Sequence, residues 1–401
     1  MGSVTVRERI YTPPVLLLAA TVGVSFLGLG FVMPLRALYG RQIGATSGEI
    51  GLMASVALLT GFLAAPGIGW LSDRFGHRTI LWIGVLAHAL LVLAYIPVGD
   101  PVLLIGLRGL EGIAIVSVLP PARALMNTLA PRSRQGEALA LVSSAQMAGI
   151  LMGPAAGTIL ASRVGYTPSF LLASIPLFTG AACALLFLPG RAAAHAAADG
   201  ALATAAASLF TSPLLLAYGL GAVYAVTNGV IQAIWSIYMA DAGASLPLIG
   251  LSYTVFALPA GLLGPIAGRL SDRRGRYQPI LIGMCGYAAI YVAFGLGVSP
   301  LWLVLLSGVE GVAAAFVGGA LNGLLADALP AGAWGKGQAN FSAAQTAGSF
   351  VGATASGFLY ALSPRAPFVA TGVVFAAGAA ALLLPAVIAL FPMRMVRVRV
   401  G

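Results

Sequence analysis

Twelve apolar segments, each about 20 residues long or longer, follow one another along this chain of 401 residues. A helix rises about 1.5 Å per residue, so a segment of this length can cross a hydrocarbon core about 30 Å thick. We therefore predict an all-α membrane protein with 12 transmembrane helices. The expected spans are residues 13–36, 49–71, 79–98, 101–128, 137–161, 167–188, 213–240, 246–268, 277–298, 300–327, 338–361 and 367–391.

The composition of the chain is also that of a membrane protein. Hydrophobic residues make up 59% of the sequence and charged residues 8%, and the mean hydropathy is +0.97. A soluble domain of this length needs a far more charged surface. The net charge of +10 is therefore expected to reflect topology in a lipid bilayer, and not affinity for nucleic acid.

The basic residues fall mostly on one side of the predicted spans. If the N-terminus is cytoplasmic, most of the 21 Lys and Arg residues are cytoplasmic, whereas Arg36, Arg41, Arg163 and Arg365 fall on the other side. The positive-inside rule therefore predicts that both termini are cytoplasmic. The first apolar segment is too long for a cleavable signal, so we expect a multi-pass protein of the plasma (inner) membrane.

The sequence repeats itself at an offset of 199 residues, which also relates Pro131 to Pro330 and Gln146 to Gln345. Such a repeat indicates two pseudo-symmetric six-helix bundles in parallel orientation, with the substrate site between them. We predict an N-terminal bundle at 1–189, a cytoplasmic linker at 190–212 and a C-terminal bundle at 213–401. The longest match relates Gly69, Leu71, Ser72, Asp73, Arg74 and Gly76 to Gly268, Leu270, Ser271, Asp272, Arg273 and Gly275.

Glu111 and Glu310 are related by the same offset, and each lies near the middle of a predicted span. Their local sequences are Gly-Leu-Glu-Gly and Gly-Val-Glu-Gly. A carboxylate is costly to keep charged in hydrocarbon, so its default role is to line a substrate or ion path and to carry a proton. The pair of glutamates points to a transporter.

The loop after the second span reads Gly-Trp-Leu-Ser-Asp-Arg-Phe-Gly-His-Arg, residues 69–78. It resembles the loop signature of the major facilitator superfamily, and a second copy runs over residues 268–276. Glycine suits the tight turn, and Asp73 suits a helix N-terminus with its positive dipole end. In the family this loop stabilises one conformation, so the resemblance implies a gate. The implied gate residues are Gly69, Asp73, Arg74, Gly76, Arg78, Asp272, Arg273 and Gly275.

Span four contains Arg-Gly-Leu-Glu-Gly, residues 108–112, which resembles the family's Arg-x-x-x-Gly motif. That motif is linked to proton transfer in proton-coupled members. Arg108 lies one turn from Glu111 on the same face, and the pair is either a permanent salt bridge or a proton switch. Ser307 replaces the equivalent arginine beside Glu310, so we expect Glu310 to exchange protons more readily than Glu111.

Span five contains Gly-Ile-Leu-Met-Gly-Pro-Ala-Ala-Gly, residues 149–157, which is similar to the family's antiporter signature. The signature residues are Gly149, Gly153, Pro154 and Gly157. Small residues spaced by four allow close helix packing, and the proline bends the span. The first span matches the drug-exporter pattern around Pro34 but lacks the membrane acid that some exporters carry there. The resemblance therefore implies antiport and leaves the position of the proton site open.

Span seven carries the side chains best suited to bind a substrate. Tyr224, Asn228 and Gln232 are spaced by four residues and Trp235 follows three later, which predicts one stripe along a helix. Aromatic rings with a few amides suit an amphipathic ligand. Gln146 and Gln345 are expected either to line the same cavity or to bond across helices, and the sequence leaves both roles open.

We predict a monomeric secondary transporter that exports small amphipathic compounds in exchange for protons by alternating access. The alternative is an uptake symporter or facilitator for a sugar or another small metabolite, which would need a more polar cavity. We see no nucleophile with a partner base, no metal-ligand cluster and no phosphate loop, so we expect neither an enzyme nor a cofactor or metal. His88 is expected to be a packed core residue.

Overall fold

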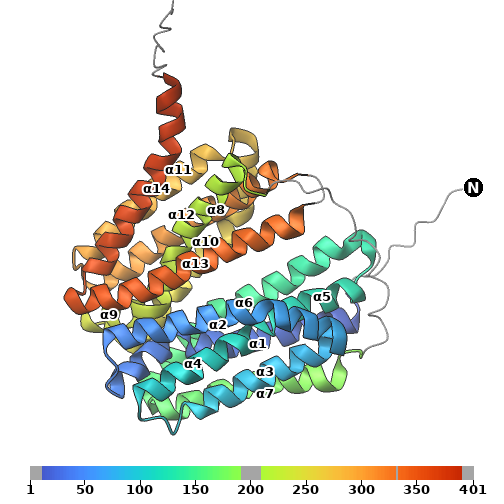
Figure 1. The fold of residues 1–401 in the computed structure, drawn as a ribbon. Coiled ribbons are helices and arrows are strands. Elements are labelled where there is room, and N and C mark those ends of the chain that lie inside the picture. Colours follow the sequence, from blue (N-terminus) through green and yellow to red (C-terminus); the bar gives the residue numbers. More distant parts are fainter. Residues whose placement is uncertain (1–10, 191–208, 331–332, 391–401) are drawn as a thin grey trace, which may run out of the picture.

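The computed structural model describes residues 11–190, 209–330 and 333–390, and helices fill most of these ranges (Figure 1). The predicted linker lies largely outside them. The N-terminal bundle contains α1 (Pro13–Gln42), α2 (Ser47–Phe75), α3 (His77–Ala94), α4 (Pro101–Val116), α5 (Leu119–Leu129), the 3-10 turn η1 (Arg132–Arg134), α6 (Gln135–Val164) and α7 (Tyr166–Phe187). The C-terminal bundle contains α8 (Ser212–Val230), η3 (Ile231–Trp235), α9 (Ser236–Asp241), α10 (Leu246–Arg274), α11 (Tyr277–Gly295), α12 (Pro300–Ala328), α13 (Trp334–Leu362) and α14 (Ala366–Leu390).

Eleven helical segments of the described chain are long and apolar enough to cross a membrane. Two of them are interrupted, Pro101–Leu129 between α4 and α5, and Ser212–Asp241 at η3. The twelfth expected span lies in α13, a helix of 29 residues whose first turns carry the polar side chains of Lys336 and Gln338. The predicted all-α membrane fold is therefore confirmed. Several helices are longer than the expected spans, because polar residues beyond the apolar segment also adopt helical conformation, as in α1, which extends to Gln42.

Local sequence signals determine where helices begin. Thr46 and Glu49 form a capping box at the start of α2: the Thr46 hydroxyl accepts from the Glu49 backbone N–H at 3.2 Å, and the Glu49 carboxylate accepts from the Thr46 N–H at 2.7 Å. Asp100 caps α4 by accepting from a backbone N–H at 3.2 Å. These caps define the turns at one end of the bundles.

Glycine forms the turns at the other end. Gly76, between α2 and α3, has φ +94°, and its counterpart Gly275 has φ +87°, values that favour glycine. The tight turns expected from the sequence therefore form at these positions. Asp73, however, does not cap α3, because Gly76 occupies the cap position and the helix begins without a side-chain cap hydrogen bond.

The two bundles use the same set of helix contacts. α1 packs on α6, α2 on α4 and α3 on α7, while α8 packs on α13, α10 on α12 and α11 on α14. Small residues allow the first of these pairs, since a Cβ atom on Gly153 would lie 2.7 Å from the Cα atom of Gly30. Gly348 and Gly352 likewise bring α13 against the backbone of α8. The internal repeat of the sequence thus corresponds to a repeat of the packing.

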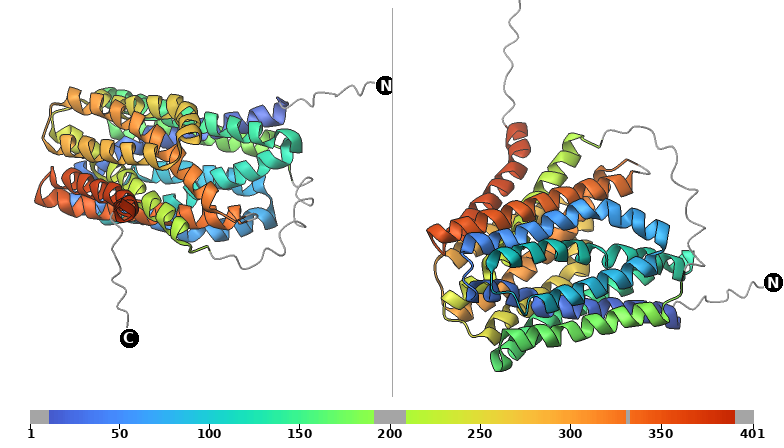
Figure 2. Two further views of the ribbon diagram at one scale, coloured as in Figure 1. Left: turned by 90° about the horizontal axis from the view of Figure 1, so that it is seen from above. Right: turned by 60° about the horizontal axis from the view of Figure 1, so that its bottom comes forward.

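The bundles meet along α2 with α13 and along α6 with α10, two contacts related by the repeat. A Cβ atom on Gly51 of α2 would lie 2.8 Å from the carbonyl oxygen of Ala353 and from the Cα atom of Gly357. The same helices diverge toward their other ends (Figures 1 and 2). There, no described atom lies within 4 Å of a Cβ placed on Gly67 or Gly69. We call the end with the α1–α2 turn the closed end, and the end with the α2–α3 turn the open end.

Candidate functional site

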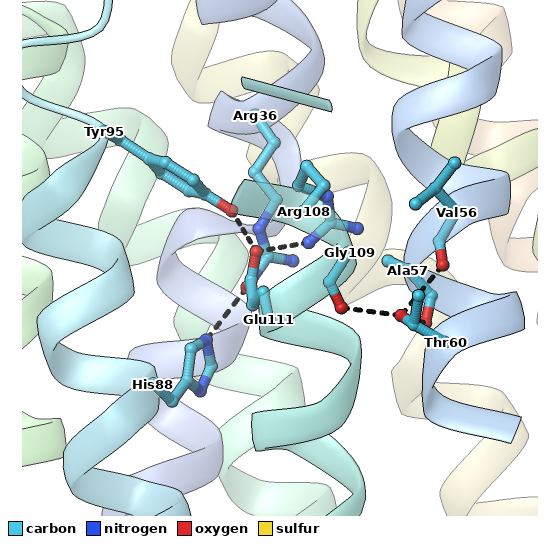
Figure 3. A network of polar contacts seen from close by, with 9 residues as sticks. All are labelled: Arg36, Val56, Ala57, Thr60, His88, Tyr95, Arg108, Gly109 and Glu111. Carbon is cyan, nitrogen blue, oxygen red and sulfur yellow. Dashed lines mark hydrogen bonds and ion pairs between the residues drawn. The ribbon is translucent and has the colours of Figure 1, made fainter. Parts of the chain in front are cut away.

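Glu111 on α4 lies at the centre of a buried polar network (Figure 3). Its Oε1 accepts hydrogen bonds from Arg36 and from Nε2 of His88, the latter at 2.9 Å. Its Oε2 accepts from Nη1 of Arg108 at 2.5 Å and from the hydroxyl of Tyr95. Because a carboxylate only accepts, His88 must carry its hydrogen on Nε2. With four donors around two oxygens, the carboxylate is fully satisfied as an anion.

The structure corrects the expected position of Arg36 and adds a role for His88. Arg36 was expected at the non-cytoplasmic end of the first span, but α1 continues to Gln42 and keeps Arg36 buried within the helix. His88 is a buried core residue, as expected, but it also bonds to Glu111. The predicted contact of Arg108 with Glu111 forms, and it is one of four. This arrangement favours a permanent salt bridge, because separation of Arg108 alone would leave Glu111 paired with Arg36.

Glu310 on α12 lies in different surroundings. It is 2% exposed, and its Oε1 accepts a hydrogen bond of 3.0 Å from the hydroxyl of Tyr291. In the described chain no basic side chain forms an ion pair with it. The ring of Tyr287 lies between those of Tyr291 and Tyr224, with centroids 6.1 and 5.8 Å away. These aromatic neighbours cannot neutralise a carboxylate, so the site suits a carboxyl group that takes up a proton.

The internal repeat explains the difference between the two glutamates. The offset of 199 residues relates each partner of Glu111 to a neutral side chain near Glu310. Trp235 and Phe294, two of these replacements, are in contact with ring centroids 4.9 Å apart. The sequence alone shows that Ser307 stands where the repeat would place an arginine. The other three replacements can be recognised only when the hydrogen-bond partners of Glu111 are known from the structure. The related pairs are Arg36 with Trp235, His88 with Tyr287, Tyr95 with Phe294, and Arg108 with Ser307.

Three of the side chains expected to form a stripe on span seven follow that pattern. Tyr224 and Gln232 are half-buried and Asn228 is exposed. Gln232 donates to the side-chain oxygen of Asn228 at 3.1 Å, and Asn228 donates to the hydroxyl of Ser349 on α13 at 3.3 Å. The two amides are therefore held together on one face of the helix.

Trp235 departs from the stripe because the helix changes its pitch. Residues Ile231–Trp235 form a π-helical turn, which adds a residue to the turn and rotates the side chains that follow. Trp235 is 2% exposed, and its indole N–H donates to the hydroxyl of Ser252 at 2.8 Å. In this conformation Trp235 is therefore a core residue of the C-terminal bundle and not a cavity residue, a correction to the regular helix assumed from the sequence.

A cavity between the bundles brings Gln232 together with Arg36 and Arg108. The sequence predicts Gln232 as a substrate residue but gives no reason to place it beside two arginines. Gln146 on α6 and Gln345 on α13 are half-buried on the helices that join the bundles. Their role in substrate binding stays a prediction.

The gate residues of the N-terminal bundle lie at the open end. Asp73 and Arg74 are exposed, and the guanidinium of Arg74 lies 5.1 Å and 5.6 Å from the ring centroids of Trp70 and Phe75. Arg78 donates from Nε to a backbone carbonyl of α7 at 3.1 Å, which ties α3 to α7. The bundles are apart at this end, so the gate contact stays a prediction.

The equivalent loop of the C-terminal bundle is held by Arg276. Its Nε donates to Oδ2 of Asp327 at 2.9 Å, and its Nη1 donates to Asp272. The hydrogen bond to Asp327, followed by that to Asp272, raises the pKa of the Arg276 guanidinium, which therefore stays charged. These bonds attach the α10–α11 turn to the end of α12. A gating role for Asp272 and Arg273 stays a prediction.

The residues of the antiporter signature pack α6 against two neighbours. Gly149, Gly153 and Gly157 face the backbone of α1. On the other side, the carbonyl oxygen of Pro154 would lie 2.6 Å from a Cβ atom on Gly250 of α10. The signature therefore lies where the N-terminal bundle contacts the opposite bundle, a place where a change of helix packing would alter the interface.

Comparison with known proteins assigns the chain to a family. The model of the Major Facilitator Superfamily matches residues 17–231 and again residues 217–390. The chain belongs to the Major Facilitator Superfamily. It is therefore a multi-pass membrane transporter of small molecules, in a family of transporters and not of enzymes.

Relatives of known sequence include multidrug resistance proteins. MdtG of Salmonella paratyphi A is 28% identical over 302 residues, which cover 70% of this chain and 72% of MdtG. MdtG of Salmonella typhi has the same identity and coverage.

Solved structures share the superfamily fold. A mutant of the nucleoside transporter NupG gives a TM-score of 0.75 at 14% identity, covering 94% of this chain and 99% of NupG. A POT family transporter in complex with a thioalcohol-conjugated peptide gives 0.72 at 12% identity, covering 93% of this chain and 95% of that transporter. At these identities the likeness shows the fold alone.

Polar contacts join the bundles of this superfamily member at the closed end. Nη1 of Arg41 on α1 lies 2.6 Å from Oδ1 of Asp241 at the end of α9, and the hydroxyl of Tyr360 on α13 donates to Oδ2 of Asp241 at 2.6 Å. Deeper in the interface, the hydroxyls of Ser55 and Thr354 are 2.7 Å apart. The Arg41–Asp241 and Ser55–Thr354 contacts cross between the bundles and must break if the closed end opens, whereas the bond of Tyr360 to Asp241 lies within the C-terminal bundle.

Asp241→Asn is therefore expected to favour opening of the closed end. Arg41 and Asp241 are 46% and 33% exposed, so their ion pair contributes less than about 1 kcal/mol and its loss should change the population a few-fold. Ser55→Cys, in a background without Cys183 and Cys285, reports the opening as a faster reaction with a maleimide. Asp100→Asn makes the same change at the same end, at a helix cap that does not join the bundles, and serves as the control. Equal labelling rates in both variants would contradict this role.

Proposed function

We propose that this transporter exports small amphipathic compounds in exchange for protons by alternating access. The observation that carries the proposal is the setting of Glu310, which is buried, bonded to Tyr291, and without an ion-pair partner in the described chain. The equivalent Glu111 is held by two arginines. Both halves of the repeat thus contain a buried glutamate. Glu310, unlike Glu111, is free to change its protonation state.

The direction of transport is supported by two further observations. The similar protein MdtG is a multidrug resistance protein. The positive-inside rule places the open end, with the α2–α3 and α10–α11 turns, on the cytoplasmic side. In that orientation, the described conformation faces the cytoplasm, which is the state in which an exporter takes up its substrate.

In this proposal each group of residues has one task. Tyr224, Asn228 and Gln232 contact the substrate, with Gln146 and Gln345 beside them. Glu310 binds a proton when the cavity faces the outside and releases it when the cavity faces the cytoplasm. The network around Glu111 holds the N-terminal bundle rigid, so that the bundles move as bodies about the α2–α13 and α6–α10 contacts.

Flux measurements in proteoliposomes test the proposal. The purified protein is reconstituted, a pH gradient is imposed, and accumulation is followed for a panel that contains lipophilic amines, aromatic carboxylates, a sugar and a nucleoside. We expect the amphipathic compounds to accumulate on the acidic side, against the proton flow, and to leak out once an ionophore collapses the gradient.

Two other outcomes would favour the uptake alternative. Accumulation of the sugar or the nucleoside on the alkaline side would indicate a symporter, because substrate and proton would then move together. Equilibration of any substrate without response to the gradient would indicate a facilitator. Either result contradicts proton-coupled export.

A further inference from the structure

The polar network of the N-terminal bundle is not balanced in charge. Arg36 and Arg108 carry two positive charges and share the single carboxylate of Glu111. Tyr95 is neutral, and His88 either is neutral or adds a further positive charge. In the described part of the chain no other carboxylate acts on the two arginines. At least one positive charge therefore stays uncompensated in a buried place, which is unfavourable unless an anion joins it.

Arg36 also has a hydrogen-bond donor that is not used. Its Nε is buried and has no hydrogen-bond partner among the described residues, and the side chain is only 8% exposed. Glu111 cannot supply the missing acceptor, because its two oxygens already accept four hydrogen bonds. An acceptor from outside the network is needed to satisfy this donor.

Both arginines line a cavity at the interface of the bundles, together with Gln232 from the opposite bundle. In the described conformation the cavity itself measures about 10 Å³, room for about one water molecule, and it continues into open space between the bundles. The other lining residues are apolar, among them Met33 on α1 and Met53 on α2, whose flexible thioether chains adapt to different ligand shapes. The lining contains two cations, one amide and no carboxylate.

We infer that this cavity binds an anionic group of the transported compound, a carboxylate or a similar anion attached to an apolar body. The inference rests on the proposed function and narrows its amphipathic substrates to anionic ones. A guanidinium presents parallel N–H donors that match the two oxygens of a carboxylate. The anion would compensate the surplus charge and accept from Arg36, while its apolar body contacts the methionines.

Such an anion would also connect the two bundles. Arg36 and Arg108 belong to the N-terminal bundle, whereas Gln232 belongs to η3 of the C-terminal bundle. A carboxylate bound to the arginines lies within reach of the Gln232 amide, which has N–H donors of its own. Substrate recognition at this site is therefore sensitive to the relative position of the bundles.

Three probes with the same aromatic body test the inference: naphthylacetate, its neutral amide naphthylacetamide, and the cation naphthylmethyl-trimethylammonium. Their affinities are measured by isothermal titration calorimetry on the purified full-length protein in detergent, without any gradient. Because charge-assisted hydrogen bonds are stronger than neutral ones, we expect the acid to bind roughly tenfold more tightly than the amide. The cation should bind most weakly.

Substitutions at two residues assign the preference for the acid to this cavity. Arg36→Met removes the surplus charge and leaves Arg108 and Glu111 as a balanced pair, so the ratio of acid to amide affinity should fall to about one. Arg36→Lys keeps the charge and should retain most of the ratio. Gln232→Glu adds a carboxylate to the cavity wall, where it compensates the surplus charge, and should also abolish the ratio, whereas the size-matched Gln232→Met keeps both arginines free for the anion and should retain most of the ratio. If Arg36→Met does not fold, the Gln232 pair decides.

Equal affinities for acid and amide, or no binding of any probe, would overturn the inference. A preference for the acid that survives both Arg36→Met and Gln232→Glu would overturn it as well. The proposed function fails by a different result, since flux that ignores the pH gradient would refute proton exchange while a preserved preference for the acid would still support the anion site.

Discussion

Glu111→Gln is expected to lower the free energy of unfolding by about 3–5 kcal/mol, the range typical of removing one partner from a buried ion pair. Glutamine has the size of glutamate but no charge, so Arg36 and Arg108 would both remain buried without their shared carboxylate. The change should appear as a clear decrease in the thermal unfolding temperature of the purified protein in detergent. Flux should decrease with it.

Glu310→Gln serves as the control for this prediction, because it is the same substitution at the repeat-related position. Tyr291 can donate to an amide oxygen as it does to the carboxylate, and no arginine is left unpaired. We therefore expect the unfolding temperature of Glu310→Gln to stay close to that of the wild type. Equal destabilisation of the two variants would show that the network around Glu111 is not a special source of stability.

Glu310→Gln is expected to abolish transport driven by a pH gradient. The amide imitates the protonated carboxyl group and cannot release a proton, so substrate binding and passive exchange should persist while accumulation against a gradient disappears. Flux in proteoliposomes with and without the gradient separates these activities. The loss in gradient-driven accumulation should be complete, which makes it the largest functional effect expected of any single substitution here.

The control for this second prediction is Glu310→Asp, which keeps a carboxyl group at the site and should retain part of the coupling. Full coupling in Glu310→Gln would contradict the assignment. If coupling were instead lost only in a Glu111→Gln protein that remained stable, the proton site would belong to the N-terminal bundle, and the network around Glu111 would be a switch.

Most of the fold could be predicted from the sequence, because its signals are local or periodic. Apolar runs of membrane length predict helices, since a backbone in lipid must satisfy its own hydrogen bonds. The offset of 199 residues predicts two similar bundles, and the contacts of α1 with α6 and of α8 with α13 follow that repeat. The glycines of the α2–α3 and α10–α11 turns are likewise recognisable, because positive φ values favour glycine.

The candidate site could be predicted only in part. Glu111, Arg108 and Glu310 stand out because acids and bases are rare in apolar spans, and the i, i+3 spacing of Arg108 and Glu111 is a local relation. Regular spacing also placed Tyr224, Asn228 and Gln232 on one face. It failed at Trp235, because a π-helical turn depends on packing around the helix and not on the spacing of residues along it.

The sequence by itself determined the helices, the two bundles and the two membrane glutamates, all of which follow from hydropathy, repetition and the rarity of charge in lipid. Only the tertiary structure decided which groups surround each glutamate. Arg36, His88 and Tyr95 reach Glu111 from α1 and α3, 75, 23 and 16 residues away in the chain, and no periodicity relates them. Contacts between helices depend on how the helices pack and rotate against one another, and this is why the surplus charge beside Gln232 became visible only in three dimensions.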